Sequence, residues 1–168
     1  MKSFGQSNLR PCFSSVADSV GVWTALACLL VWLSRARYGL AAVLWVVSFE
    51  LLNEGYGLIS GLRGYFYAAP FSTRWSLVGL VAGPVVGYAA ALARYGTSTG
   101  RVVAVAVPSA VWLGEGVWAL GAVSDTISPV YWTIEIVGSV LAMTMALVRA
   151  RPPIKPALIT ILVWLLGA

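Results

Sequence analysis

The sequence predicts an all-α protein: a polytopic membrane bundle of five to six transmembrane helices that forms a single integral membrane domain over residues 1–168. Of its 168 residues, 60% are hydrophobic and only 10% are charged. Soluble domains carry roughly 25% charged residues, so this composition excludes a soluble globule. At about 20 residues per span, the chain has room for five or six helices and almost no loop beyond them.

Apolar runs separated by short loops define the helices. In chain order they cover residues 19–34, 38–59, 75–93, 102–123, 130–148 and 156–168. Basic residues follow the first, third and fifth runs, whereas a longer loop with Pro70 follows the second and a short loop with Asp125 follows the fourth. At ~1.5 Å per residue the last run reaches about 20 Å, short of a ~30 Å hydrocarbon core.

A repeated motif indicates internal duplication. Residues 36–39, Ala-Arg-Tyr-Gly, recur at 93–96, and each copy precedes an apolar helix that carries a Glu-Gly pair. We interpret the pattern as three repeated helical hairpins, parallel copies of one two-helix unit. The alternative is that helix–arginine–helix patterns recur in any membrane protein.

The basic residues predict the orientation. With the N-terminus outside, the loops on the cytoplasmic side carry seven basic residues and the other side carries four, which fits the positive-inside rule. We therefore expect an integral protein of a bacterial cytoplasmic membrane with its N-terminus outside. A cleaved signal peptide is the alternative for the first run, but the arginines that follow that run favour an anchor.

The residue inventory excludes several kinds of chemistry. The chain has no histidine, so Ser-His-Asp and Cys-His catalysis and histidine-ligated metal sites are ruled out. Cys12 and Cys28 are 16 residues apart with no second pair, which matches no zinc or redox motif. We expect no metal and no cofactor. The arginines are scattered singly, so no nucleic-acid partner is expected.

Four carboxylates inside the expected spans are the candidate catalytic residues: Glu50, Glu54, Glu115 and Glu135. Acidic side chains cost roughly 2.5–3.5 kcal/mol at the bilayer centre and mark functional interiors. The helix directions put all four in the membrane half opposite the arginine-rich loops, with Asp18 and Asp125 flanking it. Desolvation favours the protonated acid, a competent proton donor. The alternative is helix-to-helix hydrogen bonding.

Aromatic residues accompany the acids. The expected substrate-binding residues are Trp45, Phe49, Asn53, Tyr56, Trp112, Trp118 and Trp132. Ring faces stabilise cations, so an aromatic cavity with acids at one end suits an apolar ligand that passes through positive charge. Trp75, Tyr95 and Tyr131 are instead expected in interfacial belts. Packing against lipid and core is the alternative for each ring.

Glycines recur every four residues along the third run, at Gly79, Gly83 and Gly87. Small residues at this spacing let helix backbones approach closely. The stripe predicts a close-packing face for another helix, and a homo-oligomer could also form through it.

Residues 46–54, Val-Val-Ser-Phe-Glu-Leu-Leu-Asn-Glu, resemble the early aromatic-Glu helix of the small integral-membrane terpene cyclases of fungal meroterpenoid pathways and their shorter actinobacterial counterparts. That family is all-helical, lacks metal motifs and uses intramembrane carboxylates as acid and base. The resemblance implies that Glu50 protonates an alkene or epoxide of a lipid-soluble prenylated substrate. This chain lacks a clear late helical Asp, so Glu115 is the first choice for the second carboxylate and Glu135 the reserve.

A small proton-coupled transporter or channel is the alternative, because repeated hairpins and membrane carboxylates also fit that class. All acids lie in one half, however, so the sequence shows no proton path to the other side. A structural or assembly subunit is a third possibility, supported by the glycine face.

Overall fold

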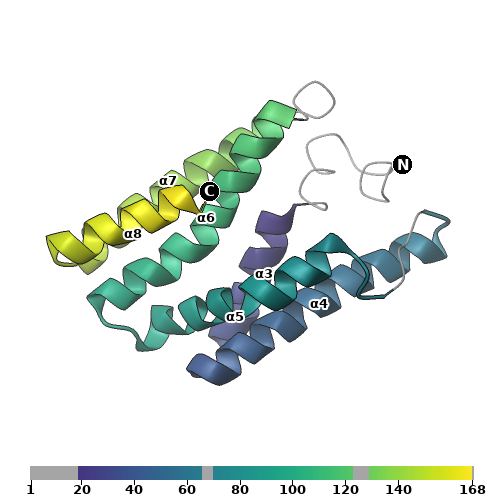
Figure 1. Ribbon diagram of the computed structural model, residues 1–168, viewed down its shortest axis with the longest axis horizontal. Coiled ribbons are helices and arrows are strands. Elements are labelled where there is room, and N and C mark those ends of the chain that lie inside the picture. The colour runs from purple at the N-terminus through teal and green to yellow at the C-terminus, as the bar shows by residue number, and fades with distance from the viewer. Residues whose placement is uncertain (1–18, 66–69, 123–128, 168) are drawn as a thin grey trace.

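The computed structural model describes residues 19–65, 70–122 and 129–167. Over these ranges the chain forms six helices and no strand, which confirms the all-α prediction. The helices are α3 (Val20–Ser34), α4 (Tyr38–Leu62), α5 (Arg74–Tyr95), α6 (Ser98–Ala122), α7 (Pro129–Ala150) and α8 (Ile154–Leu166) (Figure 1). Each expected helix is present, and the four long helices, α4 to α7, extend beyond the predicted ranges at one or both ends.

The membrane character of the chain is evident in four helices, α4 to α7, that are long and apolar enough to cross a bilayer. α3 and α8 are apolar but have only 15 and 13 residues. At ~1.5 Å per residue they reach about 20 Å, less than a ~30 Å hydrocarbon core. Large apolar side chains cover the outer surface of the bundle, among them Leu51, Val81 and Leu162, each more than half exposed. Such a surface suits lipid, since soluble monomers rarely expose wide apolar patches.

The helices pair most extensively as two hairpins, α4 with α5 and α6 with α7. α3 lies between these hairpins and contacts α4, α5 and α6, whereas α8 packs on α6 (Figure 1). The two closely paired hairpins therefore turn after α4 and after α6. The predicted repeat instead places the hairpin turns at the basic loops that follow α3, α5 and α7.

The glycine stripe of α5 explains the close pairing with α4. A Cβ added at Gly79, Gly83 or Gly87 would lie 2.6–2.8 Å from atoms of α4. The predicted close-packing face is thus present, and the helix that fills it is α4 of the same chain. A second copy of the protein would have to use another surface.

The two copies of the repeated motif meet at one end of the bundle. They lie at the α3–α4 and α5–α6 connections, where the Tyr95 hydroxyl donates to the Arg35 carbonyl at 2.7 Å. The Arg37 guanidinium lies 5.3 Å from the centre of the Tyr95 ring, and Arg94 lies 4.7 Å from that of Trp32. We call this end, where α3, α5 and α7 finish, the arginine side.

Candidate functional site

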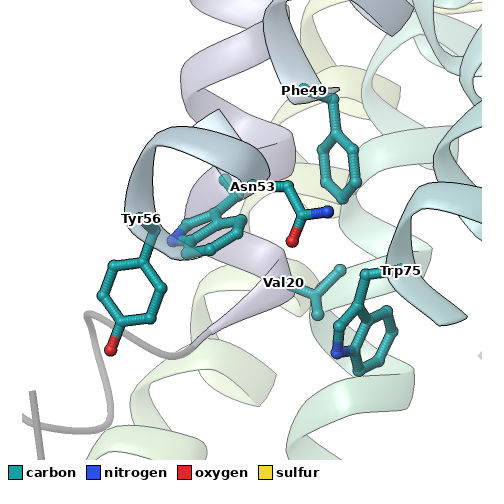
Figure 2. A pocket seen from close by; sticks show the side chains of 6 residues that line it. Val20, Phe49, Asn53, Tyr56 and Trp75 are labelled. Atoms are coloured by element: carbon teal, nitrogen blue, oxygen red, sulfur yellow. The ribbon is translucent and has the colours of Figure 1, made fainter. Parts of the chain in front are cut away.

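A pocket of about 220 Å³ lies between α3, α4 and the start of α5. Its lining is largely aromatic and comprises Val20, Trp23, Phe49, Asn53, Tyr56 and Trp75 (Figure 2). The α4 residues are spaced four and three apart, so they share one helix face. From α3, Trp23 packs edge-on against Tyr56, with ring centres 5.3 Å apart, and against Phe49 at 6.5 Å.

Asn53 is the polar group of this pocket, and contacts with α5 fix its position. Its Nδ2 donates to Thr73 Oγ1 at 3.1 Å and to Ser76 Oγ at 2.9 Å. Thr73 is the N-cap of α5 and accepts from the Ser76 amide at 3.1 Å, as N-cap threonines do. The amide of Asn53 therefore joins α4 to the first turn of α5.

Glu54, one residue further on α4, belongs to the same network. Its Oε1 accepts from the Phe71 backbone N–H at 2.9 Å and from Ser76 Oγ at 3.4 Å. These contacts tie the segment before α5 to α4. The side chain is only half-buried, and its hydrogen bonds give it a clear structural role.

Glu50 differs from its neighbours, because it is only 7% exposed and both carboxyl oxygens are buried without a hydrogen-bond partner among the described residues. Its Oε1 lies against α5 where a Cβ at Gly79 would come within 2.7 Å. Glu50 does not itself line the pocket, but Phe49 and Asn53 beside it do. Burying a polar group without a partner costs free energy, so Glu50 stands out as a functional candidate.

The other two glutamates meet at the start of α3. The Ser19 hydroxyl lies 3.0 Å from Glu115 Oε2 and 2.9 Å from Glu135 Oε1. The Tyr131 hydroxyl donates to Glu135 Oε1 at 2.6 Å. Residues from three helices thus form one hydrogen-bonded group, which we call the Ser19 cluster: Ser19, Glu115, Tyr131 and Glu135.

Glu115 has a clear structural task within the Ser19 cluster. Its Oε1 accepts from the Val20 amide at 3.0 Å and its Oε2 from the Gly21 amide at 2.6 Å. The first N–H groups of a helix have no partner within the helix, and a carboxylate is favoured at that positive end. Glu115 therefore caps α3 from α6. Only glycine fits at position 21, because a Cβ there would come within 2.6 Å of the Glu135 carboxyl group.

Glu135 is 6% exposed and retains one unused acceptor. Its Oε1 accepts from two hydroxyls, but its Oε2 is buried without a partner among the described residues. Trp132 is also buried and packs on Tyr131, with ring centres 4.7 Å apart. Its Nε1 has no hydrogen-bond partner among the described residues.

The seven expected substrate-binding residues separate into groups. Phe49, Asn53 and Tyr56 line the pocket. Trp45 stacks on Phe49 with ring centres 4.9 Å apart. Two tryptophans lie next to the Ser19 cluster: Trp112, whose Nε1 donates to the Gly21 carbonyl at 2.8 Å, and Trp132, whose ring packs on Tyr131. Trp118 lies on the outer surface of α6 and is 66% exposed.

The assignment of Tyr131 to an interfacial belt was wrong. Tyr131 is 9% exposed and its hydroxyl is bound to Glu135. Proximity to a helix end suggested the belt, but the side chain turns inward toward the acid. The sequence reasoning also missed Ser19, Val20 and Trp23, because nothing in the uniformly apolar α3 indicated which face meets the other helices.

The four glutamates form two separate arrangements rather than one shared cavity. Glu50 and Glu54 lie on α4 near the pocket, and Glu115 and Glu135 lie in the Ser19 cluster. The first turn of α3 connects them, since Ser19 bonds both acids of the cluster and Val20 lines the pocket. Asp18 and Asp125 lie outside the described residues.

Across residues 19–65, 70–122 and 129–167, no group of three or more His, Cys, Asp or Glu side chains could hold a metal ion.

Comparison with known proteins gives a family but no characterised relative. No curated protein and no solved structure matches this chain. The model of a family of unknown function, DUF6518, matches residues 1–168. Because the match spans the full length of the sequence, the chain belongs to the DUF6518 family.

Proposed function

We propose that this protein is a membrane-embedded terpene cyclase that protonates an alkene or epoxide of a lipid-soluble prenylated substrate. The observation that carries the proposal is Glu50, a buried acid whose two oxygens have no partner among the described residues and whose neighbours Phe49 and Asn53 line an aromatic pocket. A neutral carboxylic acid in an apolar site is a competent proton donor.

The pocket supports the carbocation part of the proposal. Four aromatic side chains line it, namely Trp23, Phe49, Tyr56 and Trp75, and ring faces attract cations. Its volume of about 220 Å³ is below the roughly 300–1,000 Å³ of common small-molecule sites. The pocket therefore takes the reacting end of the substrate, and the rest of the apolar chain extends into the membrane.

In the proposed reaction the Glu50 side chain turns toward the pocket that its neighbours Phe49 and Asn53 line. The π electrons of the alkene form a C–H bond with its acid hydrogen, and the O–H bond breaks to leave a carboxylate. A second alkene attacks the resulting cation and closes the ring. A carboxylate then removes a proton to form a new double bond, so the product is an isomer of the substrate, and the proton must return to Glu50 before the next turnover.

Of the two acids in the Ser19 cluster, Glu135 suits this final proton removal better than Glu115, because its Oε2 is unused whereas both oxygens of Glu115 hold α3. The substrate must then reach from the pocket past Val20 to the cluster.

The test is co-expression of the protein with a prenylating enzyme, followed by chromatography and mass spectrometry of the lipid extract. We expect a product of unchanged mass and altered retention with the natural protein, and none with Glu50→Gln. Thr144→Val is the control, since Thr144 lies on the outer surface of α7 and bonds only its own helix at Val140. Full product formation by Glu50→Gln at equal protein level would refute the assignment.

A proton-coupled transporter is the second candidate, favoured by one observation. The buried start of α3 meets the acids of the Ser19 cluster, and helix ends inside the membrane form ion and substrate sites in many transporters. Liposomes containing the purified protein and a pH-sensitive dye would test this candidate. A flux that Glu135→Gln abolishes, without any cyclised product, would favour transport over cyclisation.

A further inference from the structure

A second feature of the molecule, separate from the aromatic pocket, is a trough along α6 and α7. Near the arginine side, a hollow of about 430 Å³ is lined by residues that include Arg101, Arg149, Met145 and Ala146. Further along, a hollow of about 230 Å³ between α3 and α6 is lined by residues that include Cys28, Ser109 and Trp112. Val105 and Ala142 line both, so the two hollows adjoin.

The inner part of the trough has no free polar group for a polar ligand. Ser109 Oγ donates to the Ala106 carbonyl at 3.2 Å, and Trp112 Nε1 donates to the Gly21 carbonyl at 2.8 Å. The Cys28 sulfur accepts from Trp45 Nε1 at 3.3 Å. The remaining lining is alanine, valine and proline. Because its polar atoms are already bonded, this part suits a hydrocarbon chain.

The outer part of the trough is positively charged. Arg101 lies in the first turn of α6 and Arg149 in the last turn of α7, and both side chains are exposed. The partial charges of the α6 N-terminus and the α7 C-terminus are opposite, so the positive charge of this end comes from the two arginines. Glu115 and Glu135, the acids on the same two helices, each lie 14 residues from the arginine of their helix, roughly 21 Å along its axis. No acid on this hairpin therefore neutralises the arginines.

We propose that the trough binds one anionic membrane phospholipid, with its phosphate between Arg101 and Arg149 and one acyl chain along α6 and α7 toward Trp112. The charge and the apolar lining are arranged as such a lipid requires, with cations at the helix ends and hydrocarbon contacts toward the middle of the helices. Basic pockets between membrane helices on the cytoplasmic side are recognised sites for anionic headgroups. This inference is independent of the proposed cyclase activity.

Native mass spectrometry of the full chain, released from nanodiscs of equimolar phosphatidylglycerol and phosphatidylcholine, tests the headgroup. We expect a bound phosphatidylglycerol to persist, and the double variant Arg101→Gln/Arg149→Gln to lower the preference about thirtyfold, in line with about 1 kcal/mol for each of the two basic residues. The matched control is Arg63→Gln/Arg74→Gln, which removes the same charge at the opposite end of the bundle and should keep the preference. Equal retention of both lipids by the natural protein, or equal loss in the control, would overturn the proposal.

Two further arms test the chain and the source of the phosphate. Ala142→Phe fills the position shared by both hollows and should release the lipid while the arginines remain. Glycerol phosphate, the headgroup without its chains, should not displace the lipid at millimolar concentration. Retention of the lipid by Ala142→Phe would show that no acyl chain lies in the trough, and displacement by glycerol phosphate would show that the site binds a phosphate and not a phospholipid; either result overturns the proposal.

Discussion

Two glutamates on apolar helices of this molecule have opposite surroundings, and one is half-buried whereas the other is buried. Glu115 on α6 accepts hydrogen bonds from two backbone amides and from Ser19 at the start of α3. Glu50 on α4 accepts none among the described residues, although it is only 7% exposed. Both are acids within apolar helices, yet one caps a helix and the other accepts no hydrogen bond within 3.5 Å from the described residues. The more deeply buried acid is thus the one with fewer hydrogen-bond partners, the reverse of what burial of a polar group normally requires.

The largest effect is expected from Glu115→Leu, which removes the acceptor for the Val20 and Gly21 amides. A buried group left without a partner costs about 1–3 kcal/mol, so the free energy of unfolding should fall by about 2–5 kcal/mol. Denaturation in detergent micelles, followed by far-UV circular dichroism, measures this loss. Glu115→Gln keeps an acceptor oxygen and should lose less. If Glu115→Leu is as stable as the natural protein, the capping role is wrong.

Gly79→Ala tests how the fold accommodates Glu50. The added Cβ would lie 2.7 Å from Glu50 Oε1 and from the Phe49 ring, so α4 and α5 must separate at a cost of about 1–3 kcal/mol. The control is Gly55→Ala, where nothing lies within 4 Å of the added atom and helix propensity should stabilise the chain by up to about 1 kcal/mol. Equal stability of the two variants would contradict tight packing over Glu50.

Glu50→Met should separate stability from function. It replaces an unpartnered polar group with an apolar one, and should therefore raise the free energy of unfolding by about 1–2 kcal/mol. In the co-expression assay the same variant should form no cyclised product. A destabilised Glu50→Met protein would indicate that Glu50 has a structural partner after all, which would remove the contrast with Glu115.

Tyr131→Phe should have the smallest effect, because Glu135 Oε1 keeps its bond from Ser19. The loss of one hydrogen bond lowers the free energy of unfolding by about 1 kcal/mol. Thermal denaturation in detergent, compared with Tyr88→Phe on the outer surface of α5, measures it. A loss as large as that of Glu115→Leu would show that Tyr131 holds the whole Ser19 cluster together.

The sequence was sufficient to predict the helices and one of their interfaces. The lengths of the apolar runs determine the helices, and the four-residue spacing of Gly79, Gly83 and Gly87 predicted a close contact that the structure assigns to α4. The spacing of Glu50 and Glu54 likewise put both on one helix. These features depend only on residues near one another in the chain.

The rest of the site depends on contacts between distant residues, which the sequence pattern does not encode. Ser19 is 96 and 116 residues from its two acidic partners. α3 is apolar on every side, so no periodic pattern indicated that Trp23 would complete the pocket. Tyr131 was misassigned for the same reason, since only the tertiary position of Glu135 explains its burial.

The cap on α3 also has a consequence for biosynthesis. α3 is made before any other described helix, but the carboxylate that accepts its Val20 amide comes 95 residues later. At roughly 5–20 residues per second, that interval is about 5–20 s. During that time the first amides of α3 need water or the insertion machinery as partners. α3 therefore reaches its capped state only after Glu115 on α6 has been synthesised.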